Sequence, residues 1–246
     1  MKTAIRKTLA VLLLISVFAA FAACKKEPPV PTYSDYTYRT ESTTAPVDET
    51  ETVKSEFYTV DPSWQRNFEV AYKYFDKSTS EQTVLIKETR SETAFSAVYP
   101  ETGNMIYYKA NGDSIDSYTV VPSEEQYVHS VLKGKSISEL SSTYMKLTAV
   151  AEDLPTYTNV LFMADETVAG RACKKYIQRA YTDGKVTETV YVWVDSLFGL
   201  CLKCEDYDAD DVLQTYWETI SFSTGRVTDS SFGFDLSIYD FTEGEQ

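Results

Sequence analysis

The sequence predicts an α+β domain dominated by one antiparallel meander sheet, and three observations lead to this fold class. Short runs rich in Val, Ile, Thr and Tyr follow one another from Ser78 onward. Turn sequences such as Asn111-Gly112 and Asp183-Gly184 separate these runs, as in β-hairpins. Helical spacing of apolar residues is confined to two stretches. About 190 residues follow the N-terminal region, which fits a single domain.

The N-terminus has the order of a secretory signal. Lys2, Arg6 and Lys7 precede an apolar run over 9–23, which is too short to span a bilayer as a stable helix. Alanines come directly before Cys24, as in a lipobox, where that thiol receives diacylglycerol before cleavage. We therefore expect a lipoprotein signal peptide over 1–23 and a lipidated Cys24 as the mature N-terminus. A plain secretory signal cleaved at the same place is the alternative, and it gives the same compartment.

The charge of the chain limits the classes of partner. Cleavage before Cys24 removes three cationic residues and no acidic residue, so the formal net charge changes from −14 to −17. Such a surface repels phosphate backbones and anionic head groups, which argues against nucleic-acid binding. The membrane link is then the lipid on Cys24, because two or three acyl chains suffice for stable anchoring. We expect a lipid-anchored, extracytoplasmic protein on a cell membrane or an outer membrane.

Residues 24–56 read as a disordered tether. They are crowded with Pro, Thr, Ser and Glu and contain almost no aliphatic residues, so they cannot bury enough apolar surface to order themselves. A coil of about thirty residues spans on the order of 30 Å. Tyr33, Tyr36 and Tyr38 are interpreted as tyrosines of a solvated linker, with a docking motif as the alternative. The folded domain is expected over 57–246.

The first expected element of the domain is an N-terminal helix over 61–77. Asp61 is a suitable N-cap and Pro62 suits the first helical position. Apolar residues then recur at helical spacing, at Trp64, Phe68, Tyr72 and Phe75. This aromatic stripe is more typical of a core face than of a ligand site.

The remaining elements are strands and one short helix. The strands are expected near 82–90, 93–99, 104–110, 114–121, 158–166, 171–182, 186–195, 199–207 and 212–223. A second helix is expected from Ser136, with Ser136 and Glu139 as a capping box.

Cys201 and Cys204 have the spacing of a dithiol or a metal knuckle, but they lie in an expected strand. Positions three apart in a strand point to opposite faces, so the two thiols cannot share a metal or close a ring without a bulge. A thioredoxin-like thiol also needs a helix N-terminus. A disulfide from Cys173 to either of them is the alternative, although strands that flank a common neighbour lie far apart for it.

Other patterns give no catalytic or metal site. The acidic run 206–211 has the alternation of a calcium loop, but an EF-hand needs Gly at the sixth position and Glu at the twelfth, where Asp211 and Trp217 stand. We therefore expect a solvated hairpin turn. The single histidine, His129, is expected to be an exposed strand or loop residue, and no nucleophile motif accompanies it. The sequence predicts no enzyme, no cofactor and no metal.

The C-terminal part resembles the LolA/LolB-like lipoprotein-carrier superfamily. The resemblance covers 166–240 and extends over 62–165 only in the order of elements. It rests on Val168-Ala169-Gly170, Trp193-Val194-Asp195, Gly199-Leu200, Leu202-Lys203, Glu205, Tyr207-Asp208-Ala209-Asp210 and the closing SSFGFDLSIYDF.

The resemblance implies an incomplete antiparallel β-barrel, with an N-terminal helix and a short second helix packed on its concave side over an apolar cavity. It implies a carrier or acceptor that binds an acyl chain or another apolar ligand. A self-filled envelope module that recognises a partner protein or senses stress is the alternative. The side chains expected to line or fill the cavity are Trp64, Phe68, Tyr191, Trp193, Leu200, Leu202 and Trp217.

Overall fold

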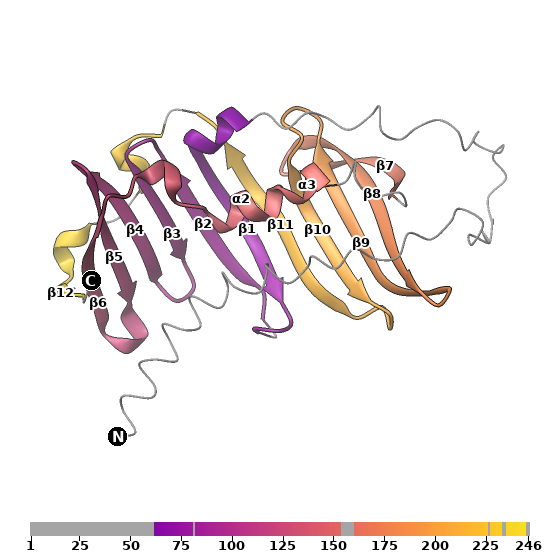
Figure 1. Cartoon of the computed structure of the whole chain (residues 1–246), viewed down its shortest axis with the longest axis horizontal. Helices are drawn as coiled ribbons and strands as arrows, with labels where there is room; N and C mark the ends of the chain where they lie inside the picture. The colour runs from indigo at the N-terminus through magenta and orange to yellow at the C-terminus, as the bar shows by residue number, and fades with distance from the viewer. Residues whose placement is uncertain (1–61, 81, 154–159, 226, 233–234, 245–246) are drawn as a thin grey trace, which may run out of the picture.

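The chain folds as one open, curved sheet of twelve strands (Figure 1). The computed structural model describes residues 62–80, 82–153, 160–225, 227–232 and 235–244. The strands lie in the order β12-β6-β5-β4-β3-β2-β1-β11-β10-β9-β8-β7. Neighbours pair antiparallel except for β12, which runs parallel to β6. This large antiparallel sheet with few helices agrees with the expected α+β class and with an incomplete barrel.

The strand bounds are β1 Phe68–Asp76, β2 Val84–Arg90, β3 Ala94–Tyr99, β4 Asn104–Asn111, β5 Ser114–Val121, β6 Gln126–Lys133, β7 Val160–Val168, β8 Arg171–Thr182, β9 Lys185–Asp195, β10 Cys201–Asp208, β11 Leu213–Ser223 and β12 Thr242–Glu243. Each of the expected strands is present, with ends that move by no more than two residues. The strands β1, β6 and β12 were not expected. The hairpin turns place Gly112 and Gly184 at φ of 62° and 71°, where glycine is favoured.

The expected helix over 61–77 is wrong, and β1 takes its place. Only Pro62–Arg66 is helical, as a short 3-10 turn, and Asp61 lies outside the described residues. From Phe68 onward alternate side chains are buried, at Phe68, Val70, Tyr72 and Tyr74. A spacing of four residues returns to the same face in a helix and also in a strand, because four is a multiple of two. The aromatic spacing therefore fitted both structures.

The segment 137–153, here called the strap, crosses one face of the sheet (Figure 1). It consists of the 3-10 turn Ile137–Glu139, α2 (Thr143–Thr148) and α3 (Val150–Asp153). The expected capping box of Ser136 and Glu139 is present, but it caps the 3-10 turn. The α-helix begins later, where Ser142 accepts a hydrogen bond from the backbone N–H of Met145. No helix in the described part of the chain has the length and apolar character needed to cross a membrane.

The two faces of the sheet carry different covers. The face under the strap, here called the strap face, includes Tyr72, Trp217 and Val192, which share the main core cluster with Tyr144 and Leu147 of the strap. On the opposite face, the described residues of the C-terminal segment, which include Val227 and Leu236, pack against β3, β4 and β5. Its Phe232 joins a second cluster with Ala94 and Tyr107.

Candidate functional site

Hydrogen bonds to three sheet residues, Glu88, Thr219 and Arg90, hold the strap against its sheet face. Glu88 Oε1 of β2 accepts hydrogen bonds from the Tyr72 hydroxyl at 2.7 Å and from the backbone N–H of Tyr144 at 3.2 Å. The Tyr144 hydroxyl lies 2.9 Å from the Thr219 hydroxyl of β11. The Arg90 guanidinium donates to the carbonyls of Ile137 and Leu140, each at 2.6 Å. These contacts hold 137–144 across β2, β1 and β11.

Glu88 is a buried carboxyl group, 1% exposed. Burial raises its pKa, and hydrogen bonds from Tyr72, Ser142, Tyr144 and Thr143 oppose that rise. The buried Arg90 has its pKa lowered by desolvation, against the attraction of Glu88. Burying such groups is costly unless they are hydrogen-bonded. The strap supplies several of these partners, so its position and the burial of Glu88 depend on each other.

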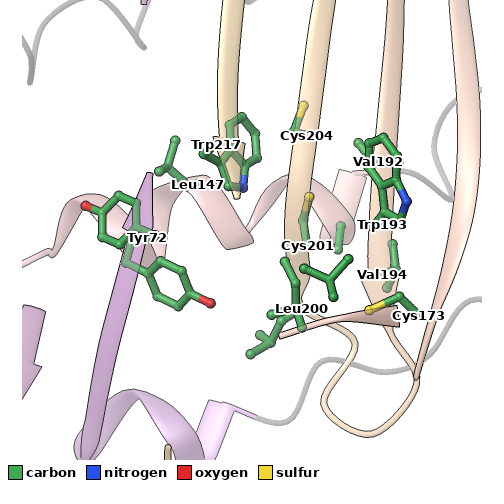
Figure 2. Packing of buried hydrophobic residues seen from close by; sticks show 14 of the residues in the cluster. Tyr72, Leu147, Cys173, Val192, Trp193, Val194, Leu200, Cys201, Cys204 and Trp217 are labelled. Carbon is green, nitrogen blue, oxygen red and sulfur yellow. The ribbon is translucent and has the colours of Figure 1, made fainter. Parts of the chain in front are cut away.

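An aromatic cluster lies between the strap and the sheet. The Tyr144 ring, from α2, has its centroid 5.2 Å from that of Tyr72, 6.3 Å from that of Phe68 and 6.0 Å from that of Trp64. Phe222 of β11 completes the cluster, 5.7 Å from Trp64 and 5.9 Å from Tyr144. Figure 2 shows the neighbouring part of this core, with Leu147 of α2 beside Trp217 of β11. The strap thus covers an aromatic surface on the central strands.

The structure buries the side chains expected at the cavity, but it divides them between the two faces. In the register, Cys204 lies opposite both Trp217 and Val192, which places those three residues on the strap face. Neighbouring strand residues point to opposite faces, so Tyr191 and Trp193 lie on the other face. The expected set therefore does not line one site. Six of the seven residues nevertheless belong to the main core cluster: Trp64, Phe68, Trp193, Leu200, Leu202 and Trp217. Tyr191 is half-buried and packs against this cluster.

On the opposite face, Trp193 is covered by charged side chains. The ammonium groups of Lys175 and Lys203 lie 4.6 Å and 4.5 Å from its ring centroid. Its indole N–H donates to Glu166 at 2.6 Å, and Lys203 pairs with Glu205 at 2.9 Å. Long lysine stems shield apolar surface while their charges stay near water. This arrangement explains how Trp193 is 2% exposed without a covering helix.

Two buried indole N–H groups on the strap face have no hydrogen-bond partner among the described residues. They belong to Trp64, which is 2% exposed, and Trp217, which is 3% exposed. A buried donor without a partner costs about 1–3 kcal/mol, so most such groups are satisfied by protein, water or a ligand. Among the described residues, these two indole groups are exceptions to that rule.

At the edge of this core, Arg171 of β8 forms an ion pair with Asp195 of β9. Its Nε and Nη2 donate to the two carboxylate oxygens at 3.0 Å and 3.2 Å. The Arg171 guanidinium carbon lies 5.0 Å from the ring centroid of Phe198 and 5.5 Å from that of Phe222. Asp195 also accepts the backbone N–H of Phe198 at 2.6 Å. The pair joins the β8 strand to the turn that precedes β10.

The expectation that Cys201 and Cys204 point to opposite faces is wrong, because β10 contains a bulge. Cys201 lies opposite Val194, yet Lys203 lies opposite Trp193, so Leu202 is the extra residue. Both cysteines then belong to the strap face and to the same core cluster (Figure 2). The bulge does not create a metal site, since no group of three or more His, Cys, Asp or Glu residues in the described part of the chain could hold an ion.

The three cysteines of the domain are free and buried thiols. The expected alternative of a disulfide from Cys173 is wrong, because β9 separates β8 from β10. Two strand spacings amount to about 9.5 Å, which exceeds the reach of a disulfide. Burial raises the pKa of Cys173 to about 11 and that of Cys201 to about 12, and it raises the pKa of Cys204 further above its ordinary value. Such thiols are poor nucleophiles.

The acidic run forms the expected hairpin turn. Asp208 ends β10, and its Oδ1 accepts the backbone N–H groups of Asp210 at 2.9 Å and Val212 at 3.0 Å. Upstream, Asp206 lies near Glu188 and Asp208. Burial, then the charges of Glu188 and Asp208, raise the pKa of Asp206 to about 6.

His129 lies in β6, as one alternative expected, but it is half-buried and has partners. Its Nδ1 is 3.2 Å from Glu243 Oε1 and its Nε2 is 3.4 Å from Asp116 Oδ1. Its ring stacks on Tyr118 at 4.8 Å. The residue therefore links β5, β6 and β12.

The anchor at Cys24 and the tether over 24–56 lie outside the described residues. Sequence reasoning missed Glu88, Arg90 and Tyr144, the residues that position the strap. The sequence did contain one sign of these buried charges. Glu88 and Arg90 follow Ile86 at every second position, so a strand places all three side chains on the same face.

Comparisons with known proteins bear on the fold alone. No family model matches this chain, and no curated protein does. An uncharacterized conserved protein from Thermus thermophilus superposes with a TM-score of 0.42 at 8% identity, over 75% of this chain and 94% of that one. A chain of the Pseudomonas aeruginosa MucA/MucB complex gives a TM-score of 0.37 at 12% identity, over 73% of this chain and 59% of that one.

A LolA superfamily protein, NE2245 from Nitrosomonas europaea, also matches, with a TM-score of 0.25 at 13% identity over 74% of this chain and 94% of that one. The superfamily that the sequence resembles is thus among the matched structures. This chain spans only about three fifths of the MucA/MucB chain. At these scores the likeness carries no information on ligand or partner.

Proposed function

We propose that this chain is a lipid-anchored extracytoplasmic protein that binds one acyl chain, or another elongated apolar ligand, between its strap and its sheet. It acts by binding and releasing this ligand and catalyses no reaction. The observation that supports the proposal most is the aromatic surface of Phe68, Tyr72 and Phe222, which the strap covers with the ring of Tyr144.

The strap is suited to open and close over such a ligand. Its helices are six and four residues long, so their own hydrogen bonds stabilise them little. It is held by side-chain contacts from Glu88, Arg90 and Thr219, which can break without disturbing the sheet ladder. When the strap lifts, the aromatic surface of Phe68, Tyr72 and Phe222 becomes available to an aliphatic chain. Segments of low local stability commonly serve as such covers.

A titration with a fluorescent fatty acid tests this function. The full chain carrying Cys24→Ala, which has no lipid of its own, should show saturable binding. Leu147→Glu places a charge under the strap, where Leu147 is 2% exposed, and should abolish binding. Ser141→Glu adds the same charge at an exposed position of the strap and should bind like the parent. Circular dichroism establishes that each variant is folded. No saturable binding by the parent chain would contradict the proposal.

The anchor is a separate part of the proposal and has its own test. A lipidated Cys24 holds the domain at the membrane, and the tether lets it reach away from the surface. Fractionation of cells that express Cys24→Ala should move the protein from membranes to the soluble fraction, and intact mass should show the loss of acyl groups. A membrane-bound mutant, together with wild type that lacks acyl mass, would contradict the anchor.

A second candidate function is supported by the dense packing of the core. Six of the seven expected lining residues are 3% exposed or less, as large side chains that fill a small barrel would be. The domain is then a self-filled envelope module that recognises another protein. This alternative predicts that no lipid copurifies and that added fatty acid leaves the unfolding temperature unchanged.

A further inference from the structure

Trp64 and Arg171 both contact the Phe222 ring of the aromatic cluster on the strap face. The Trp64 ring lies 5.7 Å from the Phe222 ring, and its N–H has no partner among the described residues. The Arg171 guanidinium carbon lies 5.5 Å from the same ring centroid. Phe222 thus contacts both a neutral donor and a cationic donor. Other cations near the core are already engaged: Arg90 donates to the strap carbonyls, and Lys175 and Lys203 lie against Trp193.

We propose that Arg171 and Trp64 form the head-group subsite of the apolar site, and that its ligand is an amphiphile with an anionic oxygen head. This inference rests on the proposed function, because it assigns a polarity and an orientation to the same ligand. The aliphatic tail runs under the strap along Phe68 and Tyr72, and the anionic group lies at the Phe222 end.

The geometry of Arg171 suits this role. A guanidinium carries five N–H donors, and the ion pair with Asp195 uses two of them. The Arg171 side chain is 21% exposed whereas that of Asp195 is 2% exposed, so the cation, and not its partner, reaches the surface. The Phe198 and Phe222 rings also hold the guanidinium by cation–π contact. A planar cation held in this way recognises carboxylate or phosphate oxygens well.

The negative net charge of the chain makes any preference for an anionic ligand informative. The chain has a formal net charge of −14, so its long-range field disfavours every anion. A preference for an anionic ligand over a neutral ligand of equal chain length must therefore come from a local cation. Arg171 is the cation that lies beside Phe222 at the edge of the core.

The test compares three ligands of equal chain length: a fatty acid, the matching fatty alcohol and the matching alkyl phosphate. Each displaces a fluorescent fatty acid from the full chain carrying Cys24→Ala, at pH 8 and at low salt. We expect the acid and the phosphate to bind about tenfold more tightly than the alcohol, with the difference shrinking as salt rises. The double variant Arg171→Gln, Asp195→Asn removes the ion pair without leaving an unpaired buried charge, and should reduce the difference to less than about twofold.

Two further variants complete the test. Trp64→Phe keeps an aromatic ring but removes the N–H, and should weaken the acid about threefold or more, since one hydrogen bond to a charged group is lost. Lys109→Gln removes an exposed cation of β4 and should leave all affinities unchanged. If the double variant does not fold, the ratio of acid to alcohol in the parent chain, and its salt dependence, still decide.

The outcomes separate this proposal from the function it rests on. Tighter binding of both anions that depends on Arg171 supports the head-group subsite. If the parent chain binds the acid and the alcohol equally, the head-group subsite is wrong, but the proposed apolar site under the strap is supported. Binding of none of the three ligands overturns both.

Discussion

The backbone N–H of Tyr144 in the strap donates a 3.2 Å hydrogen bond to Oε1 of Glu88, a carboxyl group buried in the middle of the sheet. The same oxygen accepts the Tyr72 hydroxyl at 2.7 Å. One carboxyl oxygen thus joins the strap to two neighbouring strands.

Replacement of Glu88 tests this junction. Glu88→Ala leaves the N–H of Tyr144 and the hydroxyl of Tyr72 without a partner, which should lower the free energy of unfolding by about 2–3 kcal/mol. Glu88→Gln keeps an acceptor oxygen and should cost about 1 kcal/mol or less. Urea unfolding at pH 7 measures both. Equal destabilisation by Gln and Ala would show that the charge, and not the acceptor, holds the strap.

The pKa of Glu88 also predicts a pH dependence. Burial raises this pKa above its ordinary value, with hydrogen bonds opposing the rise. A raised pKa means that the carboxyl group contributes stability below its unfolded pKa and loses that contribution as pH rises through the folded value. Glu88→Gln should therefore gain stability relative to wild type as the pH of the measurement is raised from about 4.5 to 7. A constant difference across this range would contradict the assigned direction.

The raised pKa of Asp206 predicts a second pH dependence of stability, in the same direction as that of Glu88. Burial, then the neighbouring Glu188 and Asp208, raise its pKa to about 6. Stability from this group is present below about pH 4 and is lost as pH rises to about 6. Asp206→Asn should thus melt at a higher temperature than wild type at pH 7 and at the same temperature at about pH 3.5. Asp210→Asn makes the same change of charge at an exposed turn position and serves as the matched control.

His129 predicts a pH-dependent attachment of the C-terminal strand β12. Desolvation lowers its pKa, but hydrogen bonds and charge from Glu243 and Asp116 outweigh this effect, so the net pKa is raised. The contribution of protonated His129 to stability is therefore complete below about pH 6.5, and it is lost as pH rises through the pKa of His129 in the folded protein. The backbone N–H of Gly244, bonded to the His129 carbonyl at 2.7 Å, should exchange with solvent faster at pH 8 than the intrinsic rate change accounts for. His129→Gln should remove that excess. An equal protection factor at both pH values would contradict the link.

The buried thiols predict chemical inertness. Burial raises the pKa values of Cys173, Cys201 and Cys204, so little thiolate forms at neutral pH. The folded Cys24→Ala chain should take up no iodoacetamide at pH 8 within the time that the same chain takes up three equivalents in guanidinium chloride. A mass two hydrogens lower for the native protein would reveal a disulfide and contradict the free thiols.

Much of the sheet could be predicted from the sequence, because hairpins are locally encoded. Asn111-Gly112 and Asp183-Gly184 contain the positive φ values that such turns need, and the flanking runs begin and end close to the expected residues. β6 was missed since its side chains are almost all half-buried, without the alternation that marks a strand. β12 has two residues and pairs in parallel, so no local pattern encodes it.

The candidate site was less predictable, because it depends on register and on long-range contacts. The aromatic spacing from Trp64 to Tyr72 suited a helix and a strand equally. The bulge at Leu202 reverses the faces that a regular strand gives to Cys201 and Cys204. Glu88 and Tyr144 lie 56 residues apart in the chain, and no local sequence feature pairs them.

Native mass spectrometry tests the central claim, an apolar ligand under the strap, most directly. The full chain carrying Cys24→Ala is purified from cells without detergent, and its intact mass is compared with that of folded Leu147→Glu. We predict that the parent chain carries an added mass equal to one acyl lipid, recovered by organic extraction, and that Leu147→Glu lacks it. A parent chain that is folded, lipid-free after purification and still lipid-free after incubation with a lipid extract would contradict the account.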